Sequence, residues 1–184
     1  MKGKEQLDAA LKAMIDSGVK PRGLDGTLFN LAKSYHEVAE LALAQISKTK
    51  NADFAAPALM CRSFAIELLL KYFIAVDHPG KKKTDLDAIG VDLHGHKYSV
   101  LFDRIGETHK LAIAKKYSEL SKNQSTPADF RKALLDLGDD PFVGWRYVYE
   151  ATETKYFSLE LLVTVVQSLG LAAQDVRQAG ATTA

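Results

Sequence analysis

Residues 57–76 read PALMCRSFAIELLLKYFIAV, and this stretch decides the fold. It is one of the most apolar parts of the chain, yet its charged residues make it too polar to be a membrane span. Glu67 and Lys71 are four residues apart, so a helix places them on one face, and Ser63 extends that stripe. Because a charge inside a packed helix is costly unless it is paired, the stretch predicts the central helix of a soluble bundle, with a polar seam that needs partners.

Length and composition favour one folded domain. The chain has 184 residues, of which 47% are hydrophobic and 26% charged, enough for a single sizeable core. The net charge of +1 provides no global attraction to nucleic acid. Cys61, the single cysteine, lies in the apolar helix and is expected to be a small buried side chain. The amphipathic N-terminus lacks an uninterrupted apolar region, so we expect a cytoplasmic protein without a membrane segment.

Apolar residues recur at helical spacing along almost the whole chain. Thr27 and Asn51 or Asp53 are expected to cap helices, and Thr126-Pro127-Ala128-Asp129 has the form of a capping box with proline at the first helical position. In the helix at 27–47, the residues expected to face inward are Leu28, Leu31, Tyr35, Val38, Ala42 and Ile46. The predicted helices cover about residues 4–17, 27–47, 53–77, 95–105, 108–120, 127–137 and 158–177. Residues 78–92 and 142–150 are expected to be loops. The pattern predicts an all-α, up-and-down helical bundle of about five core helices plus short accessory helices.

Three patterns occur in order along this predicted bundle. The first is Ser63-x3-Glu67-x3-Lys71, the second is Gly95-His96-Lys97 followed by Leu101, and the third is the segment WRYVYE at residues 145–150. Together they resemble the HEPN superfamily, the helical domains named for higher eukaryotes and prokaryotes nucleotide-binding. The resemblance implies one HEPN-like domain over residues 1–184, with a core at about 27–175, an accessory helix within 1–22 and a frayed tail at 179–184.

The resemblance also implies partners and a function. HEPN proteins are often homodimers in toxin–antitoxin, defence and RNA-processing systems, and some are paired with a nucleotidyltransferase. We therefore expect a bacterial protein that binds RNA, a nucleotide or a partner protein, with a nucleotidyltransferase or an antitoxin as a possible partner. The alternatives are a divergent metal-independent ribonuclease and a purely structural protein-interaction module. No cofactor is expected, since neither GxxxxGK[ST] nor GxGxxG occurs in the chain.

The catalytic motif of the superfamily is incomplete in this chain. Catalytic members are similar in an Arg-x4-6-His motif near the last core helix, and Arg146 matches its arginine. Positions 151–153 then hold Ala, Thr and Glu instead of histidine, which favours a non-catalytic protein. Arg104 and His109 form one literal Arg-x4-His match, but it lies too early in the chain, and roughly 0.5 such matches are expected by chance from the arginine and histidine content.

The candidate binding residues come from all three patterns. Arg146 could hold a loop against the bundle through Glu67 or Glu150, or it could contact a phosphate beside Lys71 while a tyrosine stacks on a base. Arg146 and His96 are also the weak candidates for catalysis. His94 and His96 are more readily explained as polar contacts at a helix start than as metal ligands, because no third ligand accompanies them. The candidate binding set is Glu67, Lys71, His96, Arg146, Tyr147, Tyr149 and Glu150.

Overall fold

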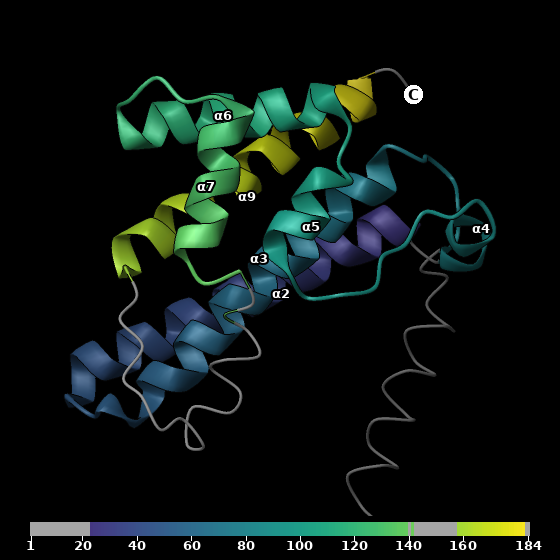
Figure 1. Cartoon of the computed structure of the whole chain (residues 1–184). Coiled ribbons are helices and arrows are strands. Elements are labelled where there is room, and N and C mark those ends of the chain that lie inside the picture. Colours follow the sequence, from purple (N-terminus) through teal and green to yellow (C-terminus); the bar gives the residue numbers. More distant parts are fainter. Residues whose placement is uncertain (1–22, 140, 142–157, 183–184) are drawn as a thin grey trace, which may run out of the picture.

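The protein folds as an all-α helical bundle, as the sequence predicts. The computed structural model describes residues 23–139, 141 and 158–182. Within these ranges there are α-helices and one short 3-10 helix and no strand, and the long helices lie against one another (Figure 1). The elements are α2 (Leu24–Thr49), η1 (Ala52–Phe54), α3 (Ala55–Val76), α4 (Lys83–Ala88), α5 (Tyr98–Asp103), α6 (Glu107–Ser121), α7 (Pro127–Asp136) and α9 (Leu159–Thr182).

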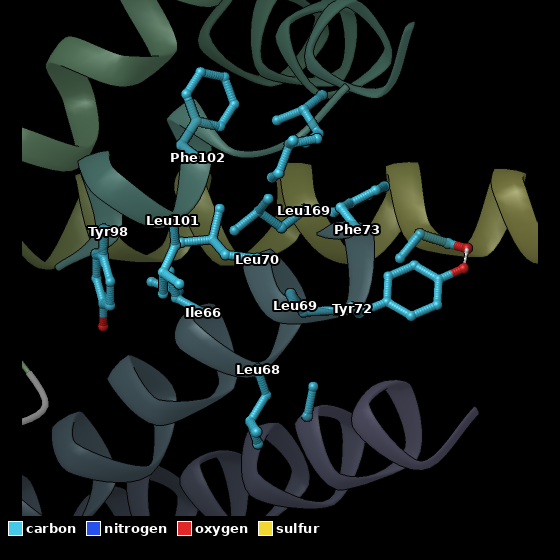
Figure 2. Packing of buried hydrophobic residues seen from close by; sticks show 14 of the residues in the cluster. Ile66, Leu68, Leu69, Leu70, Tyr72, Phe73, Tyr98, Leu101, Phe102 and Leu169 are labelled. Atoms are coloured by element: carbon cyan, nitrogen blue, oxygen red, sulfur yellow. Dashed lines mark hydrogen bonds between the residues drawn. The ribbon is translucent and has the colours of Figure 1, made fainter. Parts of the chain in front are cut away.

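Helix α3 is the centre of the bundle, as its composition predicts. It packs against α2 along most of its length and also contacts α5 and α9. Figure 2 shows Ile66 and Leu70 directed toward Leu101 of α5 and toward α9, whereas Leu68 points toward α2. Because other helices surround α3 on most sides, even its charged residues are largely buried, and the Glu67 side chain is only 1% exposed. Cys61 is buried as expected, and this burial raises the pKa of its thiol.

Helix α2 faces the core with a stripe that only partly matches the predicted one: Leu28 is buried and Tyr35 packs against the core, as expected. Ala32 and Ala39 are almost fully buried, whereas Leu31 and Val38 are 45% and 50% exposed. The prediction that Leu31 and Val38 face inward is therefore wrong. The small alanines allow the backbones of α2 and α3 to approach closely, and this close contact determines which side of α2 turns inward.

Several predicted boundaries also differ from the observed ones. Helix α2 begins at Leu24 with Gly23 as its N-cap, so Thr27 is already helical and does not cap it. The expected loop at 78–92 contains helix α4, which is held by the fully buried Leu86. Helix α5 begins only at Tyr98, and α9 continues to Thr182, past its predicted end near 177. In α6 and α9, Leu111 and Leu159 are exposed, although apolar spacing favours burial.

Two local signals in the sequence are confirmed. The Asn51 side chain accepts a hydrogen bond of 2.8 Å from the Asp53 N–H at the start of η1. Thr126 and Asp129 form a reciprocal capping box at the start of α7, with proline at the first helical position. Both caps depend on neighbouring residues alone, so they could be predicted from the sequence.

Helix α9 is also unusual in composition. Residues 159–180 are long and apolar enough to cross a membrane, while 39% of the apolar window is buried inside the bundle. Core helices of soluble bundles share this length and composition, so these properties do not identify α9 as a membrane span. In the described structure α9 packs against α3 and α6.

Candidate functional site

A buried carboxylate on α3 organises the candidate site. One oxygen of Glu67, Oε1, accepts a 2.7 Å hydrogen bond from Lys71 Nζ, one helical turn further along α3. The other, Oε2, lies 3.0 Å from Nδ1 of His96. Because a carboxylate only accepts hydrogen bonds, Nδ1 of His96 carries the proton in this contact. The predicted pairing of Glu67 with Lys71 is therefore confirmed, and His96 is a second partner for the carboxylate.

The fold brings His96 to Glu67 through a hydrogen bond between Tyr98 and Ser63, which lie near His96 and Glu67 in the chain. The Tyr98 hydroxyl donates a 2.5 Å hydrogen bond to the carbonyl oxygen of Ser63, one turn before Glu67 on α3. Tyr98 is fully buried, so this contact locks the start of α5 against α3. Gly95 has φ of +99°, a backbone conformation that favours glycine and turns the chain just before His96. His96 is thus aligned with Glu67 by its neighbours on both sides.

A second anchor holds the start of α5 from the opposite direction. Asp139 accepts hydrogen bonds from the Ser99 backbone N–H (2.6 Å) and from the Ser99 hydroxyl (3.0 Å). The Asp139 carbonyl oxygen also accepts a 2.7 Å bond from the Tyr98 N–H. The sequence analysis did not identify Asp139, although the turn sequence Gly138-Asp139 was a possible signal, since Asp tolerates the left-handed conformation that it adopts here.

His96 forms part of the wall of a surface cavity of about 350 Å³. His94, Lys97 and Arg104 line the same cavity, which therefore has basic side chains and no acidic side chain among its lining residues. The His96 side chain is 53% exposed, whereas the Glu67 side chain behind it is 1% exposed. The imidazole thus connects the buried carboxylate with the solvent-facing cavity. Such an arrangement suits an anionic ligand group.

Arg104 shapes this cavity by holding the loop that precedes α5. Its Nη1 donates to the carbonyl oxygens of Asp92 (2.8 Å) and His94 (2.9 Å), and its Nη2 lies 3.4 Å from the Asp92 carboxylate. The backbone hydrogen bond from His94 to Asp92 holds the pKa of that carboxyl group below its ordinary value. Arg104 therefore holds the loop through Nη1 and brings a positive charge to the wall of the cavity.

Arg104 and His109, the literal Arg-x4-His match, are directed to different neighbours. His109 Nδ1 lies 2.7 Å from Asp77 Oδ1, and the Gly106 N–H donates to Asp77 Oδ2 at 2.6 Å. His109 thus joins the end of α3 to the start of α6, while Arg104 holds the loop at 92–94. The expectation that this match arises by chance is consistent with these separate structural roles.

Four members of the predicted binding set lie outside the described residues. They are Arg146, Tyr147, Tyr149 and Glu150. The structure therefore brings together Glu67, Lys71 and His96 and leaves the contribution of residues 145–150 as a prediction. Among the described residues, no group of three or more His, Cys, Asp or Glu side chains is arranged to hold a metal ion.

Arg62 and Ser63 of α3 are also buried, and of these two polar residues only Ser63 stood out in the sequence. Arg62 is 4% exposed and forms an ion pair with Glu40 of α2. The Ser63 hydroxyl is buried without a hydrogen-bond partner among the described residues. His36 lies near the same ion pair, and burial lowers the pKa of this histidine, so it favours the neutral form. An arginine in an apolar stretch was the available signal, because a buried guanidinium requires a partner.

Comparison with known proteins found no matching family model, no matching curated protein and no matching solved structure. The relationship to the HEPN superfamily therefore stays a prediction from the three sequence patterns.

Proposed function

We propose that this protein binds the phosphate groups of RNA or of a nucleotide without cleaving them. The observation that supports the proposal is the buried Glu67 carboxylate, which holds the His96 imidazole at the mouth of a cavity lined by basic residues. A protonated imidazole and the Lys97 ammonium are charge-assisted donors suited to phosphate oxygens. Residues 145–150 would add Arg146 and the stacking surface of Tyr147 and Tyr149.

Glu67 has a positioning role in this proposal. Its carboxylate binds Nδ1 of His96 at 3.0 Å, and its fixed location on α3 restricts the orientation of the ring. Lys71 pairs with the other carboxylate oxygen, so Glu67 is balanced even when His96 turns toward a ligand. The buried pair therefore supports the site without contacting the ligand itself.

Fluorescence anisotropy with a labelled oligouridylate and a labelled nucleotide tests the proposal, at low salt and with EDTA present. We expect His96→Ala and Lys97→Ala each to weaken binding about tenfold, the effect of losing one charge-assisted hydrogen bond. His78→Ala is the matched control, because His78 lies in the turn after α3 and does not line the cavity. Absence of binding to both probes by the wild-type protein would overturn the proposal.

A metal-independent ribonuclease is the second candidate function. The Glu67–His96 pair favours it, because a carboxylate that orients an imidazole is a common part of acid–base sites. Labelled RNA incubated with the protein in EDTA separates this function from binding. Cleavage lost in both His96→Ala and Arg146→Ala would support the enzyme, whereas intact RNA with the wild-type protein would exclude it under those conditions.

Partner binding in a defence or toxin–antitoxin setting, homodimer formation and cytoplasmic location are further parts of the proposal. They rest on the resemblance of the three sequence patterns. Sedimentation equilibrium of the purified protein measures the oligomeric state directly. If the protein is instead a purely structural interaction module, Arg146→Ala should lower the melting temperature with no separate loss of phosphate binding.

A further inference from the structure

An apolar groove lies between α2 and α9, with lining residues different from those of the basic cavity. It has a volume of about 460 Å³ and a mainly apolar lining. Phe29 and Ala32 contribute from α2, Leu69 from α3, and Val166 and Leu171 from α9. Leu171 is 39% exposed. An apolar groove between two helices is a surface that the apolar side of another, amphipathic helix can cover.

Two features of the groove suit a closely approaching helix. A Cβ atom built on Gly170 would have no neighbouring atom within 4 Å, so the α9 side of the groove is open at this position. On the α2 side, Lys33 and Glu37 lie along the rim, with their charged groups 3.7 Å apart. The groove therefore combines an apolar centre with one positive and one negative group at defined positions on α2.

The chain contains a matching segment in residues 4–17, which precede α2 and lie outside the described residues. Their sequence, KEQLDAALKAMIDS, has the apolar spacing of an amphipathic helix, with Leu7, Leu11 and Ile15 on one side. A helix of this length is only marginally stable alone in water, so its apolar side needs a surface to cover. The connecting residues 18–22 contain glycine and proline, which favour a turn.

If residues 4–17 form a helix antiparallel to α2, one alignment of the two helices places groups of opposite charge together. In this alignment residue 17 lies opposite residue 24 of α2, and residue numbers fall along the segment as they rise along α2. Asp8 then lies opposite Lys33, and Lys4 lies opposite Glu37. Leu7 and Leu11 then lie at the level of Ser34 and Asn30, within the part of α2 that spans the groove-lining residues 29 to 37. In this register, charged groups of opposite sign lie at the same level of the two helices.

We propose that the groove between α2 and α9 is the docking site of residues 4–17 of the same chain. The short connection keeps the segment at high effective concentration beside the groove, which favours it over a separate molecule. This inference does not depend on phosphate binding, because the groove and the basic cavity have no lining residue in common.

Disulfide cross-linking tests the docking in the full-length protein. In a Cys61→Ser background, Asp8→Cys with Lys33→Cys should form an intramolecular disulfide, since docking brings these positions within bonding range. Asp8→Cys with Lys48→Cys is the control, because Lys48 lies in the last turn of α2, beyond the groove. Cross-linked monomers in the first variant alone support the proposal. Cross-linked dimers would overturn it in favour of a second copy, and no cross-link would overturn it entirely.

A second measurement covers the case in which the double variants fold poorly. Leu11→Cys in the Cys61→Ser background should react with a thiol reagent at least about tenfold more slowly in the native protein than in urea, because docking covers it. Gly170→Phe, which fills the groove, should restore fast labelling of the residue 11 thiol. Fast labelling of Leu11→Cys without the Gly170 substitution would contradict docking.

Discussion

Lys71→Met is the sharpest test of how the buried pair contributes to stability. The Glu67 side chain is 1% exposed and the Lys71 side chain 15% exposed, and their charged groups are 2.7 Å apart. Removing the ammonium leaves a buried carboxylate without its main counter-charge, a change that typically costs about 3–5 kcal/mol. His96 still pairs with one carboxylate oxygen, so we expect the lower end, about 3 kcal/mol.

Urea denaturation followed by far-ultraviolet circular dichroism measures this free energy of unfolding. Lys132→Met is a matched control, because Lys132 and Asp136 have the same helical spacing and a similar distance, 2.6 Å, but are 72% and 49% exposed. We expect this exposed pair to contribute little to the free energy of unfolding, because solvent screens its charges. The double variant Glu67→Leu/Lys71→Met removes both charges and should be more stable than Lys71→Met alone.

The refuting result is a Lys71→Met variant that loses no more stability than Lys132→Met. Burial would then not be the reason why the Glu67–Lys71 pair matters. A double variant that is less stable than Lys71→Met would also contradict the reasoning, because it would show that the carboxylate is not the source of the cost.

Three smaller predictions follow from other contacts. Gly106→Ala should cost about 1–3 kcal/mol, because the added Cβ would meet the Asp77 carboxylate at 2.8 Å and disturb its hydrogen bonds; unchanged stability in urea would contradict this. Asp103→Asn should cost less than about 1 kcal/mol near neutral pH, since Asp103 and Arg131 are 49% and 40% exposed. The hydrogen bond from Arg131 lowers the pKa of Asp103 in the folded protein, so the stabilisation by this pair is present above the pKa of Asp103 in the unfolded chain and is lost as the pH falls through its pKa in the folded protein. A stability difference between wild type and Asp103→Asn that persists in strong acid would contradict this. Thr126→Ala should cost about 1 kcal/mol by removing the cap of α7, measured by thermal unfolding.

Controls for these variants are available on the same chain. Gly180→Ala tests alanine at a glycine with open space around it, since a Cβ at Gly180 meets no atom within 4 Å; Gly106 differs in being the N-cap of α6, where alanine is less favourable than glycine. Gly180→Ala should be neutral or slightly stabilising. Asp53→Asn tests the removal of an exposed carboxylate near a short helix, with no ion pair among the described residues. A Gly180→Ala variant as destabilised as Gly106→Ala would remove the steric explanation.

The sequence by itself determined the features that depend on local spacing. Apolar residues at helical intervals predicted the all-α class, and the apolar stretch at residues 57–76 predicted the central helix. The four-residue interval between Glu67 and Lys71 predicted their contact, because a helix brings such residues together whatever surrounds it. The capping box of Thr126 and Asp129 is local in the same sense.

Only the tertiary structure decided which distant groups meet. His96 is 29 residues from Glu67 along the chain, and it reaches the carboxylate because Tyr98 binds the carbonyl oxygen of Ser63. Leu31 lies outside the core because α2 packs through Ala32 instead. Helical periodicity describes the faces of one helix, whereas the contact between two helices depends on their crossing and on the path of the intervening loop. Those are properties of the assembled bundle, and no local pattern in the chain encodes them.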